Sequence, residues 1–439
     1  MGAPMRRLHS TSTRRRCLFR ACALALLALA GGCRTDFLPP PDASIDASID
    51  LAAAPMDLGM ADLARFPDLA RTHRLSFAPA TIAYGHFLGM PGTGNITAVA
   101  VADFTGDGKP DFLRAWYAPG VDGVVQLVVL PGKGDGALDR NELVTKTGCN
   151  SSPGQLAIAD LDGDNRLDVL AGDCGMTAGI FYGRGDGTFK TGALSAALQS
   201  PVVGDFDGDG KLDVAGFSAL GVVRLAWPQP DGSLTPGPEI TVSGQPRNLV
   251  AADLNGDNRA DLVMTTPGTG GMPDRIQVLL GEANQTFKAL PVAVAGTAVT
   301  CAVAAVADLD RDGRADLVLR DAVLPGRGDG TFAAALPFPE SGYCPAAIAD
   351  FDGDGILDVS AGPELNAQGI DQSRAYLRLG HGDGRFDPVV GFDAPQIFQI
   401  HRFGAPRAAD WNSDGKPDIF GVYGGFESDG VITMINTSN

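Results

Sequence analysis

One pattern of oxygen-bearing side chains returns seven times between residues 103 and 418. Counted from its first aspartate, positions 1, 3, 5 and 9 are Asp in 25 of 28 cases and Thr or Asn in the rest. Position 6 is Gly or Asn, the residues that best tolerate a left-handed backbone, so the chain can turn sharply there. Oxygen ligands that alternate around such a turn suit a hard divalent cation, which takes roughly six to eight oxygens. The pattern therefore predicts up to seven Ca²⁺ sites.

The candidate calcium ligands are the side chains at positions 1, 3, 5 and 9 of each copy. They are Asp103, Thr105, Asp107 and Asp111; Asp160, Asp162, Asp164 and Asp168; Asp205, Asp207, Asp209 and Asp213; Asp253, Asn255, Asp257 and Asp261; Asp308, Asp310, Asp312 and Asp316; Asp350, Asp352, Asp354 and Asp358; Asp410, Asn412, Asp414 and Asp418. The backbone carbonyl of position 7 would add another oxygen, which leaves the side chain at position 7 free. A turn alone would need only one or two acidic residues, whereas four clustered carboxylates repel one another without a cation. The copies with Thr105, Asn255 and Asn412 have one charge fewer and are the weakest expected sites.

The elements that must position these side chains are short strands. The first aspartates lie 42 to 60 residues apart, a period typical of solenoids and propellers. Each period holds four short runs of strand-forming residues separated by Gly, Asn and Asp, and the small residues before each motif suit a crowded innermost strand. Seven units of four strands predict an all-β, seven-bladed β-propeller with four-stranded blades. The final run matches a third strand, so we expect an N-terminal strand within 75–85 to complete the last blade and close the ring.

The seven loops of the form DxDxDGxxD resemble those of the FG-GAP/VCBS repeat family, whose members include the propellers of integrin α subunits. The resemblance covers residues 72–439, which we assign to the propeller. It implies that each loop binds calcium between the first and second strands of a blade, as in bacterial members with a loop in every blade. The family spans adhesion, lectin-like binding and accessory domains of enzymes, so the fold does not name one activity.

The first 71 residues are typical of a leader followed by a tether. Residues 1–32 combine arginines with the apolar run 21–30, which is too short to span a bilayer, and this indicates an export signal. The ending LAGGC resembles a bacterial lipobox, which predicts lipidation of Cys33; a plain secretory signal is the alternative. Residues 33–71 form an acidic Pro/Ala/Asp low-complexity segment, which we interpret as a tether. We therefore expect an exported lipoprotein at the outer membrane or cell surface, or facing the periplasm, held to the membrane through its lipid alone.

Charge and cysteine content narrow the function classes. The formal net charge of −18 argues against nucleic-acid binding. Four cysteines remain in the predicted propeller, and an even number in an exported protein predicts disulfides, with buried thiols as the alternative. The candidates are Cys149, Cys174, Cys301 and Cys344. The first two are expected at the same end of one blade, and the last two in adjacent blades.

The connections between second and third strands vary between units, so we expect them to form the ligand face. Trp116 and Tyr117 are the first candidate ligand contacts, and the alternative is that they pack in a hydrophobic corner.

Five histidines show no metal-ligand spacing and no nucleophile motif stands out, so no catalytic residue is assigned. The predicted function is a binding or adhesion module for a glycan or a protein. A polysaccharide lyase or hydrolase on a propeller scaffold and a purely structural surface protein are the alternatives.

The tripeptide Arg-Gly-Asp occurs at 184–186 and 327–329, each time within GRGDGTF. Related stretches at 132–138 (GKGDGAL) and 380–386 (GHGDGRF) occupy the same place in their units. We therefore interpret the tripeptide as part of a turn between the third and fourth strands, formed by Gly-Asp-Gly, rather than as an adhesion signal.

Overall fold

The computed structural model describes residues 76–77, 81–85, 95–117, 124–151, 153, 155–172, 177–196, 198–218, 221–229, 233–242, 244, 246–266, 275–283, 285–294, 305–363, 374–393, 407–424 and 429–438. All regular elements in these residues are β-strands. No helix in this part of the chain is long and apolar enough to cross a membrane. The expected leader and tether, with Cys33, lie outside the described residues, as do Cys174 and Cys301.

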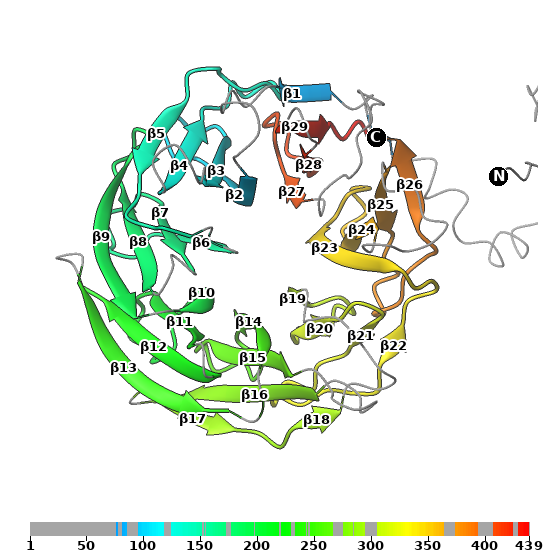
Figure 1. Ribbon diagram of the computed structural model, residues 1–439. Coiled ribbons are helices and arrows are strands. Elements are labelled where there is room, and N and C mark those ends of the chain that lie inside the picture. Colours follow the sequence, from blue (N-terminus) through cyan, green and yellow to red (C-terminus); the bar gives the residue numbers. More distant parts are fainter. Residues whose placement is uncertain are drawn as a thin grey trace, which may run out of the picture. The chain divides into compact units, whose positions relative to one another are not determined.

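The strands form seven antiparallel sheets in a ring, so the predicted seven-bladed β-propeller is confirmed (Figure 1). In each blade the first strand lies nearest the centre of the ring and the other strands follow outward. Blade 1 comprises β2 (Asn95–Ala102), β3 (Asp111–Tyr117), β4 (Val125–Leu130) and β5 (Leu143–Lys146); blade 2, β6 (Leu156–Ala159), β7 (Asp168–Ala171), β8 (Thr177–Gly183) and β9 (Phe189–Ala196); blade 3, β10 (Gln199–Gly204), β11 (Asp213–Phe217), β12 (Val222–Pro228) and β13 (Leu234–Thr241).

The remaining four blades follow the same order, with two variations. Blade 4 comprises β14 (Arg247–Ala252), β15 (Asp261–Thr266), β16 (Arg275–Glu282) and β17 (Thr286–Ala289), with β18 (Ala293–Val294) also pairing with β16; blade 5, β19 (Ala305–Ala307), β20 (Asp316–Val318), β21 (Ala322–Leu324) and β22 (Leu336–Pro337); blade 6, β23 (Tyr343–Ala349), β24 (Asp358–Pro363), β25 (Arg374–Arg378) and β26 (Val390–Asp393); blade 7, β27 (Arg407–Ala409), β28 (Asp418–Gly424), β29 (Asp429–Met434) and β1 (Thr81–Gly85).

Ring closure joins the two ends of the described chain in blade 7. Strand β1 pairs antiparallel with β29 and is the outermost strand of that blade. The pairing extends through a bridge between Phe77 and Asn436 and a 2.8 Å hydrogen bond from the Thr437 N–H to the Ser76 carbonyl. The N-terminal strand expected within 75–85 is therefore confirmed, and it covers the edge that blade 7 would otherwise expose.

The hydrophobic core is divided into seven clusters, one at each interface between neighbouring blades. Position 2 of each acidic motif contributes its large apolar side chain to the cluster shared with the next blade, and none of these side chains is more than 6% exposed. They are Phe104, Leu161, Phe206, Leu254, Leu309, Phe351 and Trp411. Position 2 therefore anchors its loop to the neighbouring blade as well as to its own.

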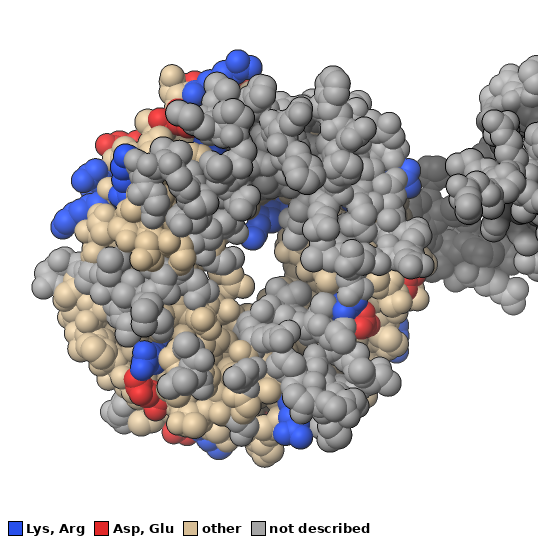
Figure 2. Space-filling view, in the orientation of Figure 1, with Lys and Arg blue, Asp and Glu red and all other residues tan. Residues whose placement is uncertain are grey.

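The innermost strands carry mainly small and branched side chains. Strand β6 is LAIA and β19 is AVA, for example. The ring has an opening at its centre, and Lys and Arg lie beside Asp and Glu around the rim (Figure 2). The narrow side chains of the first strands fit this crowded position, as the sequence predicts.

The two described cysteines of the propeller differ in state. Cys149 is fully buried and disulfide-bonded, and its partner lies outside the described residues. Cys344 keeps its thiol, so it takes part in none of the predicted disulfides in this structure. Cys344 lies instead in β23, the innermost strand of blade 6, where it pairs with Gly362 of β24.

Candidate functional site

Each acidic motif forms the connection between the first and second strands of its blade. We call these connections loops 1 to 7. They are residues 103–111, 160–168, 205–213, 253–261, 308–316, 350–358 and 410–418. Each loop begins where the inner strand ends and finishes at the first residue of the second strand, so the regular strands hold both ends of every loop.

The position-1 carboxylate organises the turn of each loop by accepting backbone N–H groups. In loop 2, Asp160 Oδ1 accepts the Gly163 N–H at 2.8 Å, and Asp160 Oδ2 accepts the Asn165 N–H at 2.8 Å.

Position 6 has a positive φ of 61° to 86° in all seven loops, which confirms the predicted left-handed residue. Position 4 is left-handed as well, with φ of 59° to 78°, even where it is Arg311 or Ser413. Sequence reasoning missed position 4, although its five glycines out of seven were a signal.

The position-9 carboxylate is buried and ties three segments of a blade together. In loop 1, Asp111 Oδ2 accepts the Phe104 N–H at 2.8 Å, and Asp111 Oδ1 accepts the Gly132 N–H at 2.8 Å. Gly132 follows the third strand, so this one side chain joins the loop to both neighbouring strands. In blade 3 the residue at the place of Gly132 is Pro228, which has no N–H to donate to Asp213.

Burial raises the pKa of every position-9 carboxyl above its ordinary value. In six loops the neighbouring carboxylates add to this rise in pKa, and backbone N–H donors oppose it in part. The pKa is about 6 for Asp168, Asp261 and Asp418 and about 7 for Asp213 and Asp358, and it is also raised for Asp111 and Asp316. The crowded carboxylates therefore disfavour full ionisation unless a cation compensates their charge.

The metal-free protein is expected to lose stability as the pH rises from about 4 to about 7. In that range an unfolded Asp has already released its proton, whereas the folded position-9 carboxyls, with a pKa of about 6 to 7, still hold theirs. The folded state then binds more protons than the unfolded state, so raising the pH favours unfolding. Urea denaturation of the metal-free protein at pH 5 and pH 7.5 measures this. Asp358→Asn should flatten the profile, and a higher midpoint at pH 7.5 would contradict the assignment.

In four of the loops three carboxylate side chains converge. In loops 2, 3, 5 and 6 the side chains at positions 1, 3 and 9 each offer an oxygen, and these oxygens lie within 4.8 Å of one another. The sets are Asp160, Asp162 and Asp168; Asp205, Asp207 and Asp213; Asp308, Asp310 and Asp316; Asp350, Asp352 and Asp358. A donor set made only of oxygens, with raised carboxyl pKa values, fits a hard divalent cation. Loops 1, 4 and 7 have a neutral residue at position 3, namely Thr105, Asn255 and Asn412.

The position-5 carboxylates behave differently, because most of them pair with the cation at position 7. The distances between the charged atoms are 3.1 Å for Lys109 and Asp107, 3.5 Å for Arg166 and Asp164, 3.6 Å for Lys211 and Asp209, 2.5 Å for Arg259 and Asp257, and 3.0 Å for Arg314 and Asp312. The position-7 side chain, which the motif leaves without a ligand role, thus pairs with the position-5 carboxylate in these five loops. Positions 5 and 7 flank the left-handed residue, which turns the two side chains toward each other.

The turn after the third strand of a blade contacts the acidic loop of the preceding blade. The N–H of Gly187 donates to the Phe104 carbonyl at 3.0 Å, and the N–H of Gly330 donates to the Leu254 carbonyl at 3.3 Å. Within the Arg-Gly-Asp turn, Asp186 Oδ1 accepts both the N–H and the hydroxyl of Thr188, at 2.9 and 2.6 Å. These bonds hold the pKa of Asp186 below its ordinary value. The geometry agrees with the interpretation of this tripeptide as a turn.

The aromatic candidates for a ligand face lie at the end of β3 remote from loop 1. Trp116 is half-buried, and the Arg114 guanidinium lies 5.9 Å from the centre of its ring. Arg114 is 3% exposed and donates to Glu142 at 2.7 Å. Trp116 thus lies beside the buried Arg114, whose partner Glu142 is exposed, while the side chain of Tyr117 and the connection 118–123 lie outside the described part of the chain.

Comparison with known proteins agrees with this architecture. Residues 160–216 and 205–264 match the FG-GAP-like repeat family. Human cartilage acidic protein 1 is 22% identical over 320 residues, which cover 69% of this chain and 40% of that protein. The solved BBS1N chain, crystallised in complex with ARL6DN, superposes with a TM-score of 0.50 at 10% identity over 83% of this chain and 99% of that chain. A solved protein from Lactobacillus plantarum has a TM-score of 0.47 at 15% identity, over 70% and 88% of the two chains. The likeness to BBS1N shows the fold alone.

Proposed function

We propose that this chain, whose FG-GAP-like repeats build a seven-bladed β-propeller, is a calcium-stabilised binding or adhesion module for a glycan or a protein. The observation that carries the proposal is the convergence of three carboxylate oxygens within 4.8 Å in each of four loops. Calcium supplies positive charge there, and the side chains at positions 1, 3 and 9 hold it. The repeats by themselves name no ligand, because this scaffold serves many functions.

The division of the propeller into two faces supports the binding role. The acidic loops and the turns after the third strands lie on one face, since the Gly187 N–H reaches the Phe104 carbonyl at 3.0 Å. That face repeats nearly the same residues in every blade. The connections between second and third strands are on the opposite face and differ in length and composition between blades. Variable loops on a regular scaffold are the usual place for recognition, so we assign the ligand to that opposite face.

Export and lipid anchoring form the second part of the proposal. They are supported by the basic leader, the apolar run 21–30 and the LAGGC sequence that ends at Cys33. In that setting millimolar calcium would be available to the loops, and the tether 33–71 would hold the propeller away from the membrane. The disulfide at Cys149 is consistent with an oxidising compartment.

The calcium role predicts that the metal-free protein takes up at least four Ca²⁺ ions per chain with affinities near the sub-millimolar range, on the order of 10⁻⁴–10⁻³ M. Titration calorimetry with CaCl₂ measures the count. Asp310→Asn should remove about one ion, because it takes one of three converging carboxylates from loop 5. Asp186→Asn, in a turn outside the loops, is the matched control and should leave the count unchanged. A metal-free protein that takes up no calcium would contradict the proposal.

The ligand role is tested by exposing the purified chain to arrays of glycans and to envelope proteins, with calcium and with EDTA. Calcium-dependent retention of one ligand class, lost when the connection 118–123 is replaced by a Gly-Ser linker, is the expected result. Depolymerisation of a retained polysaccharide would instead favour an enzyme, and retention of nothing would favour a structural protein.

A further inference from the structure

We propose that Arg259 is a built-in cation that replaces calcium in loop 4, so that this loop stays free of metal while its neighbours are loaded. The inference rests on the proposed calcium role of the other loops and distinguishes loop 4 from them. It concerns the blade 3 to blade 4 junction, where Arg259 touches both blades.

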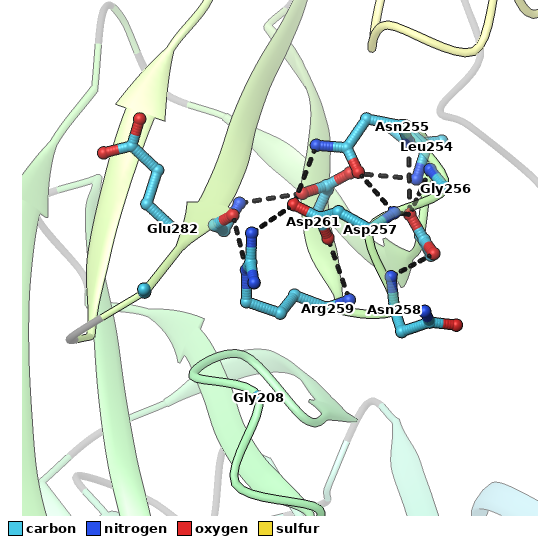
Figure 3. Close-up of polar contacts among 12 residues, drawn as sticks. Gly208, Leu254, Asn255, Gly256, Asp257, Asn258, Arg259, Asp261 and Glu282 are labelled. Carbon is cyan, nitrogen blue, oxygen red and sulfur yellow. Dashed lines mark hydrogen bonds and ion pairs between the residues drawn. The ribbon is translucent and has the colours of Figure 1, made fainter.

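The guanidinium of Arg259 lies beside the carboxylate of Asp257 in loop 4 (Figure 3). Its Nη2 lies 2.5 Å from Asp257 Oδ2, and its Nε donates to the Gly281 carbonyl at 3.2 Å. Both partners of the ion pair are 27% exposed, whereas Lys211 and Asp209 in loop 3 are 75% and 45% exposed and 3.6 Å apart. The loop 4 pair is thus the shortest and most buried of the five described pairs of this kind. An arginine stays charged at every physiological pH, so the pair is permanent.

Asn255 completes the replacement by donating a second hydrogen bond to the same carboxylate. Its Nδ2 donates to Asp257 Oδ2 at 3.1 Å, and its Oδ1 accepts the Asp257 N–H at 3.0 Å (Figure 3). The position-5 N–H makes the same bond to Asp352 in loop 6, at 3.2 Å, so what sets loop 4 apart at position 3 is the neutral amide, whose N–H group donates to Asp257 where loop 6 has a second carboxylate oxygen. Asp257 Oδ2 in turn already receives both the amide of Asn255 and the guanidinium of Arg259.

Arg259 also packs against the adjacent loop of blade 3. A Cβ built on Gly208 of loop 3 would lie 3.2 Å from Arg259 Cγ, so the arginine stem covers that glycine closely. The N–H of the next residue, Ala260, donates to the Asp205 carbonyl at 2.8 Å. Moving Arg259 aside to admit a metal ion would therefore disturb the contact between the two blades as well as the ion pair.

Loop 6 is the natural comparison, because it carries the opposite residues at both positions. Position 3 is Asp352 and position 7 is Ile356, so loop 6 has four carboxylates and no cation at position 7. Loop 4 has three carboxylates and the Arg259 guanidinium. Calcium affinity in loops of this type follows the number of charged ligands and the charge around them. The geometry thus points to loop 6 as a metal site and to loop 4 as a metal-free junction.

The test compares the same position in the two loops of the full chain. Asp253→Asn in loop 4 and Asp350→Asn in loop 6 both remove the position-1 carboxylate. Calcium ions per chain are counted by equilibrium dialysis and native mass spectrometry, and circular dichroism checks the fold. We expect Asp350→Asn to lose one ion and Asp253→Asn to lose none. A loss of one ion in Asp253→Asn would overturn the inference.

A gain-of-site variant tests the cause. Asn255→Asp with Arg259→Ile gives loop 4 the residues of loop 6 at positions 3 and 7, and it should bind one ion more than the parent. The matched control Lys211→Ile removes the exposed cation of loop 3 and should leave the count unchanged. In EDTA the loop 4 variant should melt several degrees lower than Lys211→Ile, because it loses the built-in cation. An unchanged count in a folded loop 4 variant would also overturn the inference.

The two proposals fail in different ways. A parent chain that binds no calcium at all would contradict the proposed function, and with it the premise that loop 4 differs from calcium-loaded neighbours. A parent chain that loses an ion on both Asp253→Asn and Asp350→Asn would support the calcium role and contradict the role of Arg259.

Discussion

Removing calcium is expected to lower the melting temperature of the propeller by about 5–10 °C at neutral pH. Four loops place three carboxylate oxygens within 4.8 Å of one another, and their mutual repulsion is uncompensated without a cation. At the affinity of extracellular calcium modules, ~1 mM calcium stabilises by about 0.4–1.4 kcal/mol per site, or about 2–6 kcal/mol for four sites. Scanning calorimetry at pH 7.5 with 1 mM CaCl₂ or 1 mM EDTA measures the difference.

The controls for this experiment separate calcium from general screening. Monovalent salt at equal ionic strength should not restore the melting temperature, because screening weakens repulsion without bridging the ligands. The double variant Asp162→Asn and Asp207→Asn, which weakens loops 2 and 3, should reduce the calcium effect by about half, since two of the four converging sets are damaged. A melting temperature that exhaustive chelation leaves unchanged would show that the loops hold their shape without metal.

Trp411→Ala is expected to lower the free energy of unfolding by about 3–5 kcal/mol. Trp411 is 2% exposed, stacks on Phe420 with ring centroids 5.7 Å apart, and meets Phe112 of blade 1 edge-on at 6.4 Å. Its indole N–H donates to the Gly136 carbonyl, also in blade 1, at 2.7 Å. These contacts lie at the interface between blades 7 and 1, where the ring closes, so the cavity left by alanine weakens the closure itself. Urea denaturation followed by circular dichroism measures the loss.

Trp411→Phe is the matched variant for that prediction. It keeps an aromatic ring against Phe420 and Phe112 and removes the hydrogen bond to Gly136, so it should cost about 1–2 kcal/mol. An alanine variant within about 1 kcal/mol of the parent would contradict the importance of this interface, because the cavity alone accounts for more than that.

Much of the fold could be predicted from the sequence because a blade is a local structure. Its strands are joined by short turns whose Gly and Asp residues specify the hairpins, so counting seven motifs gives seven blades. Closure by an N-terminal strand followed from the missing fourth strand after 429–434. The left-handed position 6 of each loop was equally local, because only the turn's own backbone demands it.

The partners of the loop side chains could not be predicted from the motif. Some of them lie in other blades, and others depend on side-chain directions that the motif does not specify. The Trp411 indole and its acceptor Gly136 are 275 residues apart, and the Asn436 amide donates to the Phe351 carbonyl across 85 residues. The motif gave no partner for the position-7 cations, and five of them pair with position 5. The ends of each pair lie only two residues apart, but the direction of the two side chains is set only once the turn is folded.

The sequence by itself determined which oxygens each loop offers and that seven such loops stand on one ring. Only the tertiary structure decided which of those oxygens remain available to a cation. Loops 2 and 4 both carry Arg at position 7, but the Arg259 guanidinium lies 2.5 Å from Asp257 with both side chains 27% exposed, whereas Arg166 lies 3.5 Å from Asp164 and is 53% exposed. The physical reason is that ion pairs and hydrogen bonds form within about 3 Å, and such distances depend on how the strands and neighbouring blades place each side chain.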